Sequence, residues 1–244
     1  MKTVYQVEDE YGSVMVQDDG ECYILAFASH DEQSRCLKAA PHILQYDYTQ
    51  AMLLVLLFCY PKRVLLLGLG GGTLVNALYH AVSGIHITAV ELRAKVIEVA
   101  QRYFQVPNAK RIELLNQNAD DFLLDNELRK VDVIFADLYD ATGTADVQLR
   151  EDFIRRCADL LKEQGWLVLN CWQEQKDDPY LRASLHEHFA DVRSVLTGSK
   201  NWVILAGKVA NYQASNVLKE AAANWSAKLE FSLHKHLARL RYLE

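Results

Sequence analysis

Two aspartates three residues apart, Asp137 and Asp140, follow the apolar run at residues 131–136. A run of this kind predicts a buried strand of a parallel sheet, and open parallel sheets bind ligands beyond the carboxyl ends of their strands. Carboxylates at that edge can hold an ammonium group and take a proton from an attacking amine. We predict Asp137 as a general base, with Asp140 orienting the substrate. The alternative is that Asp140 only organises the turn before Gly143 and that Asp137 only anchors the loop.

A glycine-rich segment suggests a nucleotide site. Gly68, Gly70 and Gly72 follow the leucine-rich run at residues 64–67 and precede a helix-forming segment. Without side chains, the backbone turns tightly and comes close to a ligand lying over the helix N-terminus. Glu91 ends the next expected strand about 20 residues later, where a carboxylate can accept hydrogen bonds from both ribose hydroxyls. The other interpretation of Glu91 is a surface glutamate at a strand end.

A third element, Gln117-Asn118-Ala119, follows the third expected strand. The Asn118 amide can accept a hydrogen bond from the adenine amino group and donate one to a ring nitrogen, while Ala119 lies against the ring. Asn118 also fits the N-cap of the helix that follows, and the two roles do not exclude each other.

These elements together predict a site for an adenosyl-sulfonium nucleotide, S-adenosylmethionine or its decarboxylated form. An amine that is protonated at neutral pH has no lone pair, so alkyl transfer from a sulfonium carbon needs a nearby base and negative charge. Asp137 and Asp140 would supply both.

The elements that must position these residues alternate along the chain. Short strands alternate with amphipathic helices from residue 63 onward, which predicts a parallel sheet with crossover helices. The last two strands flank a short turn-forming segment and predict a hairpin, so the sheet should end in an antiparallel edge. The strands are expected at residues 64–67, 85–90, 112–115, 131–136, 166–170, 192–196 and 202–206, and the helices near residues 73–82, 94–104, 119–128, 149–162 and 178–189.

Two further segments flank this core. Residues 1–45 alternate apolar and polar side chains between turn signals and predict a small antiparallel β meander. We expect residues 46–210 to form a Rossmann-like nucleotide-binding catalytic domain that begins with an apolar helix at residues 49–58. Residues 211–244 predict a helical tail that packs on its own domain or across a dimer.

The amino-acid composition restricts the classes of ligand that the protein is expected to bind. The chain of 244 residues has a formal net charge of −6, which argues against nucleic acid and suits a small cationic amine. Its five scattered cysteines predict neither disulfides nor a zinc site. The histidine pairs at residues 186 and 188 and at residues 234 and 236 are interpreted as helix-surface residues, and no metal is expected. The apolar run at residues 51–60 is too short for a membrane span, so a cytoplasmic protein is expected.

These motifs together resemble the spermidine synthase family of polyamine aminopropyltransferases, over roughly residues 1 to 205. The resemblance implies a Rossmann-like doubly wound α/β sheet of the S-adenosylmethionine-dependent methyltransferase type, with a small N-terminal β region. It also implies a homodimer and aminopropyl transfer from decarboxylated S-adenosylmethionine to a polyamine. In that family an Asp-x-x-Asp loop carries the base and holds the polyamine, which supports the roles given to Asp137 and Asp140.

The resemblance adds five residues for substrate binding. Tyr139 lies within the loop, and Trp172 and Gln173 follow the fifth expected strand, where the family lines its substrate groove; core or rim packing is the other interpretation of Trp172. Tyr48 and Gln50 stand where the family has Tyr-His-Glu.

Other positions depart from the family pattern. Gly71 replaces an aspartate that binds the aminopropyl end of the donor, Gln117-Asn118-Ala119 replaces Gly-Asp-Ala, and Ala141 replaces a proline. Three alternatives therefore stay open: a methyltransferase acting on a small substrate, a nucleotide-binding protein without turnover and, on the shared glycine and acidic pattern, an NAD-dependent dehydrogenase.

Overall fold

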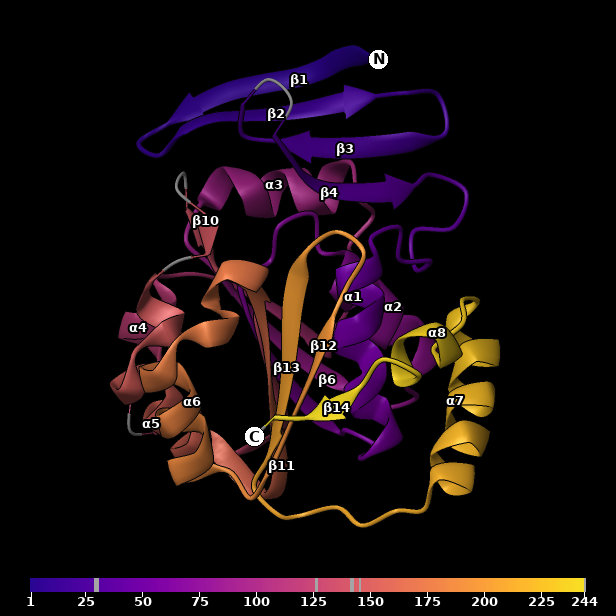
Figure 1. The fold of residues 1–244 in the computed structure, drawn as a ribbon. Helices are drawn as coiled ribbons and strands as arrows, with labels where there is room; N and C mark the ends of the chain where they lie inside the picture. The colour runs from indigo at the N-terminus through magenta and orange to yellow at the C-terminus, as the bar shows by residue number, and fades with distance from the viewer. Residues whose placement is uncertain (29–30, 126, 141–142, 145, 244) are drawn as a thin grey trace.

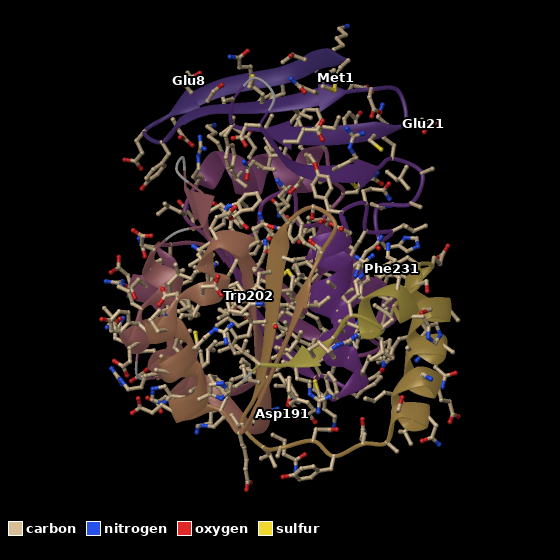
Figure 2. All side chains as sticks on the ribbon, viewed as in Figure 1. Met1, Glu8, Glu21, Asp191, Trp202 and Phe231 are labelled. Carbon is tan, nitrogen blue, oxygen red and sulfur yellow. The ribbon has the colours of Figure 1, made fainter. Side chains whose placement is uncertain are left out.

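The computed structural model describes residues 1–244 except 29–30, 126, 141–142, 145 and 244, and the side chains of residues 140, 143 and 144. A small N-terminal sheet lies at one end of the molecule, above a larger sheet flanked by helices, and the C-terminal helices run along one side of the body (Figure 1). Side chains fill the space between these layers, with Trp202 in the middle of the body and Asp191 at the end opposite Glu8 (Figure 2).

The large sheet has eight strands in the order β14-β12-β13-β11-β8-β5-β6-β7. Strands β11, β8, β5, β6 and β7 run parallel, while β13, β12 and β14 add an antiparallel edge. The sheet is thus the doubly wound α/β arrangement expected from the sequence, including the hairpin at its edge. The strands are β5 (Arg63–Leu67), β6 (His86–Glu91), β7 (Ile112–Asn116), β8 (Val131–Ala136), β11 (Leu161–Trp172), β12 (Asp191–Leu196), β13 (Asn201–Gly207) and β14 (Arg241–Tyr242).

The two faces of the sheet bury alternate residues of the same strands. In β5, Val64 and Leu66 join one apolar cluster, whereas Leu65 and Leu67 join the other. Because successive side chains of a strand point to opposite faces, a continuous leucine run is what a strand covered on both sides requires. One face carries α1 (Asp47–Met52), η1 (Leu53–Leu57), α2 (Thr73–Ala81) and α7 (Ser215–Leu229), and the other carries α4 (Ala119–Phe122), α5 (Glu151–Leu160) and α6 (Pro179–His188).

Two expected helices differ from the sequence prediction. The helix expected at residues 119–128 ends at Phe122, so α4 is a single turn capped by Asn118. The apolar helix expected at residues 49–58 changes from α1 to the 3-10 helix η1 at Leu53. Periodicity shows which residues are buried but does not distinguish these two helical forms.

The N-terminal sheet covers α3 (Ala94–Arg102) with one face. Val14, Val16 and Leu25 form a third apolar cluster with Val96 and Val99 of α3. The expected meander is therefore present, and it packs on α3, the helix that begins three residues after Glu91. Its strands are β1 (Lys2–Asp9), β2 (Gly12–Asp18), β3 (Cys22–Ala26) and β4 (Glu32–Leu37), and the short strands β9 (Tyr139–Asp140) and β10 (Gly143–Thr144) form a separate hairpin.

The tail packs on its own domain, as one of the two arrangements expected from the sequence. Leu218, Ala222 and Trp225 of α7 are buried against η1 and α2. The short helix α8 (His234–Leu237) and β14 then return the chain to the sheet edge. The interpretation of His236 as a surface residue was wrong, because it is 2% exposed and lies beside Gln50.

Two further features of the described residues concern membrane-spanning helices and disulfide bonds. None of their helices is both long and apolar enough to cross a membrane. Their five cysteines are unpaired.

Candidate active site

A cavity of about 240 Å³ lies at the carboxyl ends of β5, β6 and β8. This is the edge at which the topology of a doubly wound sheet opens a crevice. Eight of the thirteen residues predicted from the sequence meet there. They are Gly68, Gly70, Glu91, Asn118, Ala119, Asp137, Tyr139 and Tyr48.

The glycines of the loop are required for different reasons: close approach of the backbone at one position and a left-handed backbone conformation at two others. A Cβ at Gly68 would lie 2.4 Å from the backbone oxygen of Asp137, so this glycine lets the loop lie against the end of β8. Gly70 and Gly72 have φ angles of 53° and 69°, which glycine adopts without strain. Gly72 is the N-cap of α2 and faces Val106. It therefore shapes the loop and does not line the cavity.

Gly71 is enclosed by the N-terminal sheet and by the end of α3. A Cβ at this position would lie 2.7 Å from Phe104 and 2.8 Å from Ser34. The Ser34 hydroxyl accepts a hydrogen bond from the Gly71 amide at 2.9 Å. The position of the family aspartate is therefore filled by neighbouring side chains.

The Glu91 carboxylate is tied to the glycine loop. One oxygen accepts hydrogen bonds from the amides of Leu69 and Gly70, at 3.0 and 3.4 Å, and the other accepts one from the Arg93 amide at 3.0 Å. Burial raises the pKa of Glu91, whereas these hydrogen bonds lower it. The oxygen that binds the Arg93 amide accepts a single hydrogen bond from the protein, so it keeps a lone pair to which a ribose hydroxyl can donate.

Arg93 adds a lining residue that the sequence analysis did not identify. Its guanidinium binds Asp9 at 2.8 Å and the Gly12 carbonyl at 2.8 Å, and it stacks over the Phe27 ring. The arginine charge is therefore neutralised by the N-terminal sheet. Glu91 and Asp137 are the other charged groups among the described lining residues, so the cavity carries a net negative charge and favours a cation.

Asn118 and Ala119 both line the cavity, but the hydrogen bonds of Asn118 differ from those expected from the sequence. The Asn118 Oδ1 atom accepts hydrogen bonds from the amides of Asp120 and Asp121, at 2.8 and 3.4 Å. This is the helix N-cap foreseen as an alternative, and it uses both lone pairs of the oxygen. The amide is left with its NH₂ group as a donor toward a ligand. Acceptance of a hydrogen bond from an adenine amino group, as expected from the sequence, does not fit this geometry.

Asp137 lies at the end of β8 with its carboxylate held by two donors. The Asn170 side chain donates to Oδ1 at 2.8 Å, and the Tyr48 hydroxyl donates as well. Burial raises the pKa of Asp137 to about 6, and these two hydrogen bonds oppose that rise. At neutral pH the group is mostly ionised, yet it is a better proton acceptor than an ordinary aspartate, as a general base requires.

A buried polar network supports this base. Asn170, at the carboxyl end of β11, also donates to the Tyr139 hydroxyl at 3.1 Å, and its own oxygen accepts from Asn201 at 3.1 Å. Asn201 donates to the Tyr139 hydroxyl as well, at 3.3 Å. Asn170 is fully buried, and the network fixes the position of Asp137 against Tyr139.

Gln148 extends the network to the loop that follows Asp137. Its Nε2 atom donates to the Asn170 carbonyl at 2.7 Å, and its oxygen accepts from the Leu138 amide at 3.0 Å. None of these amide side chains was identified from the sequence. The available signal was a polar residue, Asn170, directly after the apolar run at residues 166–169.

The structure places the remaining predicted residues less centrally. Trp172 stacks edge-to-face on Tyr139, with ring centroids 5.8 Å apart, and so lies one side chain behind the cavity. Gln173 lies in η3 (Gln173–Asp177) and donates to Glu174. Gln50 is buried, donates to the Leu44 carbonyl at 2.7 Å and lies beside His236. Neither Gln50 nor Gln173 is among the described residues that line the cavity.

Asp140 follows the lining residue Tyr139 in the two-residue strand β9, where it pairs with Gly143 of β10. Its side chain lies outside the described residues, so its predicted role in orienting a substrate stays a prediction.

Comparisons with known proteins agree with this geometry. The Spermine/spermidine synthase domain matches residues 46–198. A polyamine aminopropyltransferase of Neisseria meningitidis serogroup A is 27% identical over 169 residues, which cover 68% of this chain. The chain spans 64% of the length of that relative.

Solved structures share the fold. A probable spermidine synthase from Corynebacterium glutamicum has a TM-score of 0.79 at 17% identity and covers 98% of this chain and 90% of its own. A spermidine synthase in complex with the transition-state analogue AdoDATO has a TM-score of 0.72 at 20% identity, over 98% of this chain and 84% of its own. With a domain match over more than half of its residues, this chain belongs to the spermine/spermidine synthase domain family.

Proposed function

We propose that this protein is an aminopropyltransferase that moves an aminopropyl group from decarboxylated S-adenosylmethionine to a polyamine, with Asp137 as the base. The observation that carries the proposal is the placement of a partly buried carboxylate, with a pKa raised to about 6, in the same cavity as Glu91 and the glycine loop. The polyamine aminopropyltransferases among its relatives support the reaction class.

The donor would lie across the carboxyl ends of the strands. Glu91 would accept a hydrogen bond from a ribose hydroxyl, and the Asn118 amide would donate to the adenine. The donor carries a positive sulfonium, which the negative cavity favours. The AdoDATO complex of a structural neighbour supports a donor of this type.

The transfer would be a single displacement at the carbon next to sulfur. The amine nitrogen attacks that carbon and forms the new C–N bond, while the C–S bond breaks and its electron pair stays on sulfur. Asp137 takes one proton from the substrate ammonium before the attack, which frees the nitrogen lone pair. The products are a neutral thioether, a protonated secondary amine and a protonated Asp137, which returns its proton to water. Holding the reacting atoms in line removes much of the entropic barrier.

Aromatic side chains would complete the acceptor end. Tyr48 and Tyr139 line the cavity beside Asp137, and Trp172 supports Tyr139 from behind. Aromatic faces stabilise an ammonium group through cation–π attraction and leave it close to the carboxylate. Gln173 and Asp140 would act farther along the acceptor, where the chain of a diamine extends. A cytoplasmic homodimer that requires no metal for this reaction is the setting we propose.

Product analysis by mass spectrometry tests the proposal. The wild-type protein is incubated with decarboxylated S-adenosylmethionine and a panel of diamines and triamines, and in parallel with S-adenosylmethionine. An aminopropylated amine and equimolar thioether are expected from the first donor only. A methylated amine from the second donor, or no transfer despite tight donor binding, would overturn the proposal.

A further inference from the structure

Two histidines and a glutamate from distant parts of the chain meet outside the cavity. His42 precedes α1, His80 lies in the last turn of α2, and Glu230 follows α7. One ligand atom from each residue lies within 4.8 Å of the other two. We propose that these three side chains form a binding site for a divalent transition metal such as Zn²⁺. The proposal does not depend on the proposed function.

Hydrogen bonding accounts for only part of this arrangement. Nε2 of His42 lies 2.8 Å from Oε1 of Glu230, which is a hydrogen bond. Nε2 of His80 lies 3.8 Å from the same oxygen, which is too far for one. The His80 Nε2 atom therefore lies near Oε1 of Glu230 without forming a hydrogen bond to it. A metal ion shared by the three atoms explains that convergence.

The distances suit a zinc ion after small movements. Zinc bonds of about 2.0–2.2 Å in a tetrahedron place the ligand atoms roughly 3.3–3.5 Å apart. The His42–Glu230 pair would separate by roughly half an ångström and the His80–Glu230 pair would close by a similar amount. The two imidazole nitrogens lie within 4.8 Å of each other and would close by at most about 1.5 Å. His80 and Glu230 are exposed, so their side chains can rotate to make this adjustment.

The chemistry of the ligands selects the class of ion. Two imidazoles and one carboxylate suit zinc, nickel or copper, whereas magnesium and calcium prefer oxygen alone. The rings of His42 and His80 stack 3.8 Å apart at an angle of 17°. This stacking presents the Nε2 atoms of both rings to Oε1 of Glu230.

The backbone at Glu230 supports a specific role for this residue. It has a φ angle of 59°, in the left-handed region where helix ends normally use glycine. A non-glycine residue there carries a conformational cost, and its carboxylate is directed to the two histidines. A bound metal would link the end of α7, through Glu230, to His80 of α2 and to His42 in the segment before Tyr48.

Thermal unfolding with and without metal tests the site. The protein is treated with a chelator, dialysed, and heated with increasing zinc chloride; titration calorimetry gives the stoichiometry. We expect one zinc ion per chain. At about 100 times the dissociation constant, the melting temperature should rise by roughly 5–10 °C, because the metal binds the folded state alone.

Two ligand variants and one control make the test specific. Glu230→Gly removes a ligand at a position where glycine is unstrained, so this variant should fold at least as stably without metal and lose the zinc response. His80→Ala should lose the response as well. His86→Ala removes an exposed histidine of β6 and should keep it. A wild-type protein that shows no zinc response, or a response that persists in Glu230→Gly and His80→Ala, would overturn the proposal.

Discussion

The side-chain amide of Asn170 donates a 2.8 Å hydrogen bond to Oδ1 of Asp137, so two neighbouring strands jointly define the base. Burial weakens the acidity of Asp137, and the Asn170 donor limits that effect by stabilising the carboxylate. The balance between the two sets the pH above which the base is available.

Replacing Asn170 should raise the pKa of Asp137. A hydrogen bond to a charged group contributes about 1.5–3 kcal/mol, so Asn170→Ala should move the acidic limb of the activity profile up by about 1–2 pH units. Asn170→Asp should move it farther, because a second carboxylate replaces the donor. The measurement is kcat against pH for the three proteins. An unchanged acidic limb in both variants would show that Asn170 does not control the base.

Asp137→Asn should lower activity and raise stability at neutral pH. Loss of a general base typically lowers kcat by about 10²–10⁴-fold. The folded pKa of Asp137 is above the unfolded one, so the native state binds more protons between about pH 4 and 6 and wild-type stability falls as pH rises through that window. The variant removes this penalty, which we estimate at roughly 1–3 kcal/mol after allowing for partial solvent exposure.

Melting temperatures of Asp137→Asn and the wild type between pH 4 and 8 check the second part. The stability difference should grow between about pH 4 and 6 and level off above. A constant difference across this range would mean that Asp137 is not desolvated as the structure indicates.

Gly71→Asp should destabilise the protein without improving donor binding. The new Cβ would lie within 2.9 Å of the buried Phe104 ring and of Ser34, so the loop or the N-terminal sheet must shift. Overpacking of this kind costs about 1–3 kcal/mol. The checks are the free energy of unfolding and the Kd for decarboxylated S-adenosylmethionine. An equally stable variant with tighter donor binding would contradict the packing argument.

Much of the sheet was predictable because local rules determine it. Runs such as Val131–Ala136 are apolar at every position but Asp132, as a strand covered on both faces requires, and the hairpin at the sheet edge follows from its turn residues. The cavity residues at strand ends were predictable for the same reason. Glu91 and Asp137 meet because parallel strands end at one edge of the sheet.

Other features depend on contacts that no local pattern encodes. Asn170 and Arg93 reach the site through sheet register and through the packing of the N-terminal sheet. His42, His80 and Glu230 are far apart in sequence and meet only because the tail folds back along α2. The substrate role predicted for Gln50 from its place in a family motif fails for a similar reason, since its amide is bonded within the protein core.

Calorimetric titration of wild type and Glu91→Gln with decarboxylated S-adenosylmethionine, S-adenosylmethionine and NAD tests the proposed donor site most directly. We expect the wild type to bind the decarboxylated donor most tightly. We also expect Glu91→Gln to weaken this binding by about 10–100-fold, because the ribose hydroxyl then meets a neutral acceptor and the cavity loses a negative charge that favours the cationic donor. Equal affinity of both proteins for that donor, or a wild-type preference for NAD, would contradict the account.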